Sequence, residues 1–373
     1  MNDETRQFQM EVLTPVHIGN GMKKVRNIDF YTKETGTVMV DIDQVAKDIS
    51  DDSSLIRNME RMGDNYSIGD FIQKYRRYLS SRIERSYPVR CESREILEYE
   101  RNGMGVPYIP GSSLKGSIRT AILVKLFKEK NAYEQEKLLR SVRNNRNPKW
   151  ASQDILKNLL GQNPNKDIMR TIRVFDAHFT EDDIGLLETK IFSLTNYGGW
   201  TWKKTKYGEM KVFGEILKPG SKSQVTLSLD QFLLKNPIAK RKLHFSGKIP
   251  DDFEKLSSLI NNHSRIAIES EVEFYQKYEK GRELDRFFIE YEKVLSEIPE
   301  NGSGFVIRLG WGSGWKSMTG DYIPDNWLRQ YRAQFRMGRR GVDSFPKSRK
   351  IGIQNNHPLY PLGWIKLTKV SNQ

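Results

Sequence analysis

Residues 305–315 read Phe-Val-Ile-Arg-Leu-Gly-Trp-Gly-Ser-Gly-Trp, an apolar segment that runs directly into a loop of alternating glycines. The β-branched and aromatic residues before Gly310 predict a buried strand. Gly310, Gly312 and Gly314 then remove the Cβ atom at every second position. Because no side chain stands in the way, such a loop can bring its backbone N–H groups close to a large anion. The segment therefore predicts a sheet strand that ends in an anion-binding loop.

Two tryptophans alternate with these glycines, and a lysine follows at once. Trp311 and Trp315 can offer flat faces to a nucleic-acid base. The alternative is a tight turn whose tryptophans fill a core. On the binding interpretation, the loop contributes these residues to a nucleic-acid site: Gly310, Trp311, Gly312, Ser313, Gly314, Trp315 and Lys316.

Working outward from the loop, short strands mix with a few long helices. The alternation of Phe8, Met10 and Val12 with polar residues predicts an opening strand. The segments 210–217 and 224–229 alternate on either side of a Lys-Pro-Gly-Ser sequence, which predicts a β-hairpin. Further strands are expected near residues 28–31, 38–42, 171–179 and 363–370, and helices at 68–79, 112–130 and 252–297. This mixture predicts an α+β fold rather than a βαβ ladder.

The composition indicates a folded chain with more than one domain. It has 373 residues, of which 37% are hydrophobic, and this length predicts two domains. No stretch approaches 18 consecutive apolar residues and the N-terminus is polar, so neither a membrane span nor a signal peptide is expected. Cys91 is the only cysteine, which excludes a disulfide within the chain and favours a reducing, cytoplasmic compartment.

The positive charge of the chain is unevenly distributed. The formal net charge is +14, yet residues 251–300 carry seven Lys and Arg against thirteen Asp and Glu, a balance of −6. The remainder therefore holds +20, and a concentrated positive balance points to a polyanion, most often nucleic acid. A charged surface that serves solubility alone is the alternative.

A second motif occupies residues 108–119, Tyr-Ile-Pro-Gly-Ser-Ser-Leu-Lys-Gly-Ser-Ile-Arg. Ser112 or Ser113 is a natural N-cap for the helix that follows. Lys115 in the first turn and Arg119 one turn later oppose the helix dipole unless an anion binds there. A phosphate would meet free N–H groups, serine hydroxyls and both cations. The alternative is an ordinary capped helix; a nucleotide P-loop is discounted because its lysine is missing.

A third motif, residues 196–208, interleaves four aromatic residues with three lysines and three glycines. A loop of this composition is suited to stacking on bases and following phosphates. A hairpin tip whose tryptophans pack back on a sheet is an equally good interpretation. The candidate binding residues are Trp200, Trp202, Lys203, Lys204 and Lys206.

A fourth segment, residues 329–350, sets eight basic residues against a single acid, Asp343. Glycines at 338 and 341 and Pro346 forbid a continuous helix beyond Arg336. A solvated basic loop explains the pattern, and contact with a nucleic-acid backbone explains it as well. The candidate residues are Arg336, Arg339 and Arg340.

Metal and nucleophile chemistry has little support. The five histidines are scattered, with no His-x-x-x-His pair, so we expect neither a metal site nor a cofactor. His17, in the loop after the first strand, is the one candidate general base, for metal-free RNA cleavage through a 2′-OH. The alternatives are a structural or an RNA-contacting histidine.

Together these segments resemble the RAMP superfamily of CRISPR proteins. The similarity rests on the opening strand with Leu-Thr-Pro-Val-His-Ile-Gly-Asn-Gly at 13–21, on the Ile-Pro-Gly-Ser-Ser-Leu-Lys-Gly-Ser-Ile-Arg segment at 109–119, and on the glycine loop. The 305–320 segment and the closing residues 357–367 resemble the Csm subunit that caps the 3′ end of the guide RNA in type III-A effector complexes.

This resemblance implies two ferredoxin-like, RNA-recognition-type domains. The first spans residues 1–235 with helical insertions; the second spans residues 236–373, with the acidic helical region and the glycine loop. It also implies binding of guide RNA (crRNA), a part in guide maturation and complex assembly in antiviral defence, and no nuclease centre in this subunit. The implied partners are the neighbouring backbone RAMP subunit, other Csm subunits and host nucleases.

Two other functions are left open. The first is a metal-independent endoribonuclease that processes guide precursors, with His17 as base and Lys115 or a tyrosine assisting. Such enzymes share the fold and the glycine loop, but they are usually shorter and lack the Pro-Gly-Ser-Ser-Leu-Lys-Gly helix start. The second is a scaffold whose basic surface binds an acidic protein.

Overall fold

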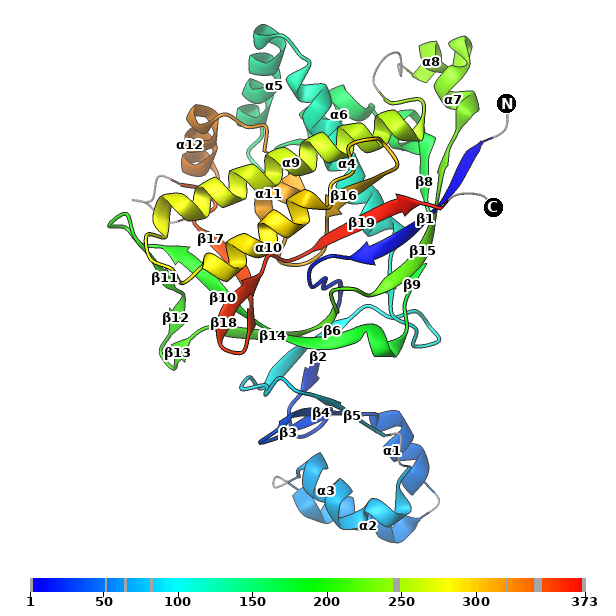
Figure 1. Ribbon diagram of the computed structural model, residues 1–373, viewed down its shortest axis with the longest axis vertical. Coiled ribbons are helices and arrows are strands. Elements are labelled where there is room, and N and C mark those ends of the chain that lie inside the picture. Colours follow the sequence, from blue (N-terminus) through cyan, green and yellow to red (C-terminus); the bar gives the residue numbers. More distant parts are fainter. Residues whose placement is uncertain are drawn as a thin grey trace.

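The computed structural model describes residues 3–50, 52–63, 66–80, 83–243, 249–319, 321–338 and 344–370. Two curled sheets and the helices packed on them form the body, and a smaller lobe projects from one end (Figure 1). None of the helices in these ranges has the length and apolar character that a bilayer crossing requires. The predicted α+β class is confirmed.

The first sheet is entirely antiparallel and joins the two ends of the chain. Its strand order is β16-β19-β1-β15-β8. The opening strand lies at its centre, because Phe8, Met10 and Val12 alternate inward and are fully buried. The bounds are β1 Glu4–Val12, β8 Ile172–Val174, β15 Lys222–Leu229, β16 Gly304–Arg308 and β19 Trp364–Lys369. The strands predicted before the glycine loop and at the C-terminus are confirmed.

Two helices separate the strands of this sheet along the chain. α4 (Gly111–Lys128) follows β1 and precedes β8, while α9 (Phe253–Tyr278) follows β15 and precedes β16 and β19. The resulting order β19-β1-β15-β8 is compatible with a ferredoxin-like βαββαβ unit, to which β16 adds an edge. α9 is tied to that edge by polar contacts: Ser264 Oγ donates to Val306 O at 2.7 Å, and Val306 N donates to Asn261 Oδ1 at 3.0 Å.

The second sheet has the order β18-β17-β10-β14-β6-β2. β14 and β6 run parallel, and the other neighbours are antiparallel. The bounds are β2 Gly19–Val25, β6 Glu95–Tyr99, β10 Ile184–Leu194, β14 Lys211–Leu217, β17 Ser348–Gln354 and β18 His357–Tyr360. Both sheets take strands from either side of residue 235, so the predicted boundary there does not separate them and stays a prediction.

The predicted hairpin around residues 218–221 is wrong in its pairing. β14 and β15 form at the expected places, but β14 pairs with β10 and β6, whereas β15 pairs with β1 and β8. The turn bends the chain from one sheet to the other: Gly220 N donates to Val12 O at 2.7 Å, and Val12 N donates to Ser221 O at 2.9 Å. Alternation fixes which residues form a strand, but one of the two partners of β15, the opening strand β1, lies more than 200 residues away in the sequence.

The remaining helices pack around the sheets. The acidic region forms two helices, α9 and α10 (Asp285–Ser296), as predicted, and Figure 1 shows them lying across β16 and β19. The basic stretch that starts at residue 329, for which a solvated loop was one interpretation, begins inside helix α12. The other helices are α5 Ala132–Asn144, α6 Gln153–Leu160, α7 Gln231–Lys235, α8 Pro237–Leu243, α11 Gly314–Thr319 and α12 Asp325–Gln334. Short strand pairs are β7 Tyr108–Ile109 with β9 Ala177–His178, β11 Trp200–Trp202 with β10, and β12 Lys204–Thr205 with β13 Gly208–Glu209.

The projecting lobe has its own small core. It combines the sheet β3-β4-β5 with three helices, and its buried residues form a separate cluster around Phe71 and Ile72. Asp41, Asp52 and Ser67 cap the three helices through their side chains, which explains why these short helices form. The bounds are β3 Phe30–Lys33, β4 Gly36–Val40, β5 Glu84–Tyr87, α1 Ile42–Ile49, α2 Ser53–Met62 and α3 Ile68–Tyr75.

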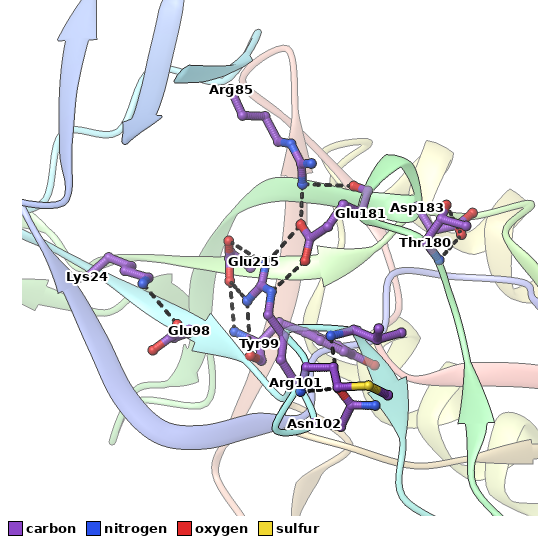
Figure 2. A network of polar contacts seen from close by, with 12 residues as sticks. Lys24, Arg85, Glu98, Tyr99, Arg101, Asn102, Thr180, Glu181, Asp183 and Glu215 are labelled. Atoms are coloured by element: carbon purple, nitrogen blue, oxygen red, sulfur yellow. Dashed lines mark hydrogen bonds and ion pairs between the residues drawn. The ribbon is translucent and has the colours of Figure 1, made fainter. Parts of the chain in front are cut away.

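A network of ion pairs joins the lobe to the second sheet (Figure 2). Arg85 of β5 pairs with Glu181, and Glu181 Oε1 also accepts from Arg101 Nε at 2.6 Å. Arg101 Nη1 lies 2.8 Å from Glu215 Oε2, and Glu215 Oε2 also accepts from Tyr99 N at 3.0 Å. Because Glu215 is only 3% exposed, Arg101 neutralises a carboxylate that water cannot reach. The network fixes where the lobe leaves the body.

Candidate nucleic-acid interface

The start of α4 and the glycine loop, about 190 residues apart in the sequence, line one cleft of about 720 Å³. Its lining includes Ser113 and Arg119 of α4 and Gly310, Ser313 and Trp315 of the loop. Apolar side chains from α6, from α12 and from the residue that follows α12 also line it, including Ile155, Leu156, Leu328, Tyr331 and Phe335. Two motifs that the sequence marked independently therefore meet at one site.

The helix start differs from the predicted one. Pro110 is the N-cap residue of α4, and Ser112 and Ser113 lie inside the first turn, so the expected serine cap is wrong. Gly111 N donates instead to Asp176 Oδ1 at 2.7 Å. A Cβ atom at Gly111 would lie 2.3 Å from Val174 O, so the glycine permits this close approach of helix and strand. Ser113 faces the cleft, whereas Ser112 is exposed.

The two cations of the helix start share one carboxylate from the chain itself. Arg119 Nη2 lies 3.7 Å from Asp167 Oδ2. Burial lowers the pKa of Lys115; the charge of Asp167 opposes this change and that of Arg173 adds to it. Asp167 therefore supplies part of the negative charge that the sequence led us to expect from a ligand. Arg173 is itself paired with Asp3 and Asp230, so the helix start sets Lys115 and Arg119 against the single carboxylate of Asp167.

The glycine loop packs against the loop that carries His17. Trp311 N donates to His17 O at 2.8 Å, and Ser313 Oγ donates to Gly310 O at 2.8 Å. Gly310, Gly312 and Gly314 all have positive φ, at 82°, 90° and 85°, so the loop is indeed a tight turn. A Cβ atom at Gly310 would lie 2.6 Å from His17 O, whereas one at Gly314 would meet no described atom within 4 Å.

The aromatic and basic residues of this loop point to different neighbours. Trp311 packs beside Leu187, Ile216 and Leu362. Trp315 lines the cleft, and its ring packs edge-on against that of Phe345, with 5.2 Å between the ring centroids. Lys316 Nζ pairs with Asp321 Oδ2 at 2.9 Å. Part of the binding surface expected here is therefore engaged within the chain.

His17 is buried, which disfavours a catalytic role. It is 5% exposed, and its Nδ1 donates to Glu215 O at 2.6 Å. The ring lies edge-on against Tyr99 and Trp311. Burial lowers its pKa. The small space beside His17, about 10 Å³, is too small for a nucleotide. These contacts agree with the structural interpretation of this histidine.

The loop at residues 196–208 divides into packed tryptophans and exposed lysines. Trp202 is 9% exposed and donates from Nε1 to Glu283 Oε1 at 2.8 Å, and Trp200 stacks on Phe192 at 4.4 Å. The tryptophans therefore pack back on the sheet, which was the alternative interpretation. The aromatic and basic side chains of this segment that are exposed are Tyr197, Lys203, Lys204, Lys206 and Tyr207. They lie outside the residues that line the cleft.

Of the candidate residues in the basic stretch at 329–350, only Arg336 can be placed, but the stretch also contains one cation that the sequence analysis did not select. Arg336 is exposed, and Arg339 and Arg340 lie outside the described residues. The pattern missed Lys350, at the end of the same stretch, whose Nζ lies 4.4 Å from the centre of the Trp311 ring. The sequence offered one indication of this position. Lys350 follows Arg349 directly, and neighbouring residues of a strand face opposite sides of the sheet, so the two cations had to lie on different surfaces.

The chain is similar in sequence to two Csm5 proteins. Over 98% of its length the chain is 23% identical to the CRISPR system Cms protein Csm5 of Methanocaldococcus jannaschii, of which the match covers 89%. It is 25% identical over 301 residues to the Csm5 protein of Streptococcus thermophilus, a match that covers 68% of this chain and 75% of that protein. Both relatives are therefore similar to it along most of their length.

Two solved structures share the fold. One chain of the cryo-EM structure of a Csm-crRNA-target RNA ternary complex from a type III-A CRISPR-Cas system superposes with a TM-score of 0.66 at 21% identity, covering 98% of this chain and 100% of that one. The crystal structure of T. onnurineus Csm5 gives a TM-score of 0.65 at 21% identity, covering 96% and 99%. Residues 9–337 match the RAMP superfamily. The chain thus belongs to the RAMP superfamily and has the fold of Csm5 proteins.

Proposed function

We propose that this protein is the guide-RNA-binding subunit of a type III-A Csm effector complex that caps the 3′ end of the guide. The observation that carries the proposal is the cleft in which the start of α4 meets the glycine loop. Both Csm5 relatives are named as CRISPR system proteins, and the structural neighbour comes from a complex of Csm subunits with crRNA. The net charge of +14 suits a polyanionic partner.

The cleft has the chemistry that single-stranded RNA requires. Ser113 and Arg119 in its lining supply donors for phosphate or ribose oxygens. The apolar walls and Trp315 offer surfaces against which bases can pack. Nothing in such a lining reads base edges in a fixed order, so we expect little sequence preference.

The first test removes the cations at the helix start. We expect Lys115→Ala with Arg119→Ala to weaken the binding of single-stranded RNA and to reduce the salt slope, log Kd against log salt, by about 1.4, because each lost phosphate contact contributes about 0.7. Lys125→Ala with Lys128→Ala is the matched control, since it removes the same charge from the far end of the same helix. Fluorescence anisotropy between 50 and 300 mM salt gives both slopes. Equal slopes for the two double variants would refute an RNA site at the helix start.

The capping role needs the assembled complex. If the subunit covers the 3′ end, complexes purified with it should hold guides of one discrete length, because the covered nucleotides resist nucleases. Complexes assembled without it should hold guides with heterogeneous 3′ ends. Sequencing the co-purified RNA distinguishes the two outcomes, and identical guide ends in both preparations would contradict capping.

The endoribonuclease alternative leads to a separate prediction about His17. Because its ring is buried and donates to Glu215 O, we expect the purified protein not to cleave a guide precursor without metal. We expect His17→Gln to lower the melting temperature by loosening the glycine loop. Denaturing gels of labelled precursor RNA check the first point and thermal melts the second. Cleavage at one position that His17→Gln abolishes would establish the enzyme instead.

A further inference from the structure

Lys350 is a partly buried cation with no carboxylate partner in the described part of the chain. It lies on β17 opposite Ile191 of β10. Its Nζ lies over the ring of Trp311, 4.4 Å from the centroid. Burial lowers its pKa, and no acid among the residues that the structure describes opposes this change. An ammonium group held in this way lacks the counter-charge that buried cations normally have.

A second lysine on the same sheet shows what the chain does when it supplies the counter-charge. Lys190 lies on β10 opposite Ile351, is also partly buried, and also places Nζ over an indole, that of Trp202 at 5.7 Å. Its ammonium pairs with Glu209 Oε2 at 2.8 Å. The two lysines thus lie on neighbouring strands of one sheet and share partial burial and contact with an indole, but within the described ranges only Lys190 has a carboxylate partner.

The ring beneath Lys350 is fixed in place. Trp311 N donates to His17 O, the imidazole of His17 packs edge-on against the indole at 5.7 Å, and Leu362 lies in the same apolar cluster. The ammonium group is therefore held beside the glycine loop. Neither Lys350 nor Trp311 lines the cleft, so Lys350 places a positive charge beside the loop at a location outside the cleft.

We infer that Lys350 binds a backbone phosphate of the guide RNA next to Trp311, so that the RNA contacts the glycine loop from this surface as well as from the cleft. The inference rests on the proposed function. A phosphate is the anion that the proposed ligand carries at every nucleotide, and it supplies the charge that Glu209 supplies to Lys190. Because Lys350 already covers one face of Trp311, this face of the indole does not stack on a base.

The test compares Lys350→Met with Lys190→Met in the full-length protein, using a uridine-rich single-stranded RNA as probe. We expect Lys350→Met to reduce the salt slope by about 0.7, the contribution of one phosphate contact. A slope of about 0.7 changes the affinity roughly five-fold for each tenfold change in salt, so the loss of this contact should weaken binding roughly five-fold at 0.1 M salt relative to 1 M salt. Lys190→Met should leave the slope unchanged and lower the melting temperature, because it breaks an ion pair. Lys350→Arg should restore wild-type RNA binding.

The opposite outcomes overturn the inference in distinguishable ways. If Lys350→Met keeps the wild-type slope while its melting temperature falls, Lys350 serves only to hold Trp311. If the slope is unchanged but the variant no longer assembles with the neighbouring subunit, the counter-charge is a protein carboxylate. If the wild type binds no RNA at any salt concentration, the proposed function fails and this inference with it.

Discussion

Glu271→Ala should lower the free energy of unfolding by about 3–5 kcal/mol, because it leaves buried guanidinium groups without a carboxylate. Glu271 of α9 lies 2.9 Å from Arg349 Nε and 3.9 Å from Arg308 Nη1. All three side chains are less than a tenth exposed. Arg308 belongs to the first sheet and Arg349 to the second, so this one carboxylate neutralises charges from both sheets. Urea unfolding measured at equilibrium gives the difference.

The control for this prediction lies two residues along the same helix. Glu273 is exposed, and Glu273→Ala should change the free energy of unfolding by no more than about 0.5 kcal/mol. Because buried pairs are screened little by salt, the gap between the two variants should persist at 0.5 M salt. Equal stabilities for the two variants would show that the arginines find other partners or water when the carboxylate is gone.

Gly310→Ala should destabilise the protein by roughly 2–3 kcal/mol, and Gly314→Ala by only about 1 kcal/mol. Both residues have positive φ, which alone accounts for the smaller figure. At Gly310 the added Cβ would also lie 2.6 Å from His17 O, and relief of that clash would break the hydrogen bond from Trp311 N. Thermal and urea unfolding of the two variants give the comparison.

Gly314→Ala then isolates the contribution of the loop to binding. Its Cβ would meet no described atom within 4 Å, so any loss of RNA affinity beyond the small loss of stability reports a ligand at that place. We expect Gly314→Ala to lower the free energy of RNA binding by more than it lowers the free energy of unfolding. Gly314→Ala that binds RNA as well as the wild type would show that the loop is only a turn at this residue. The sequence led us to expect the same of Gly312, but a Cβ there would meet Leu362 Cδ1 at 2.6 Å, so its effects on fold and binding cannot be separated.

The local elements and the motifs were predictable because their signals lie within one strand or helix. β1, β16 and β19 follow from alternation and β-branched residues, and α4 follows from the spacing of Leu114, Ile118 and Ile122. The resemblance to the RAMP superfamily rested on the same short segments. The match of residues 9–337 to that superfamily confirms it. The sequence also predicted that the helix start and the glycine loop are binding motifs, but it did not show that they lie side by side.

Only the tertiary structure decided which of these segments meet. β14 and β15 flank a good turn signal, yet each pairs with strands from elsewhere, because sheet order depends on burial across the whole body and not on the turn. The same holds for charge. Asp167 at the helix start, Glu271 between two arginines and Lys350 without a carboxylate are all separated in sequence from the groups that define their roles. The sequence alone determined the charges that the chain carries, but only folding decided which are neutralised, since electrostatic interaction depends on distance and burial.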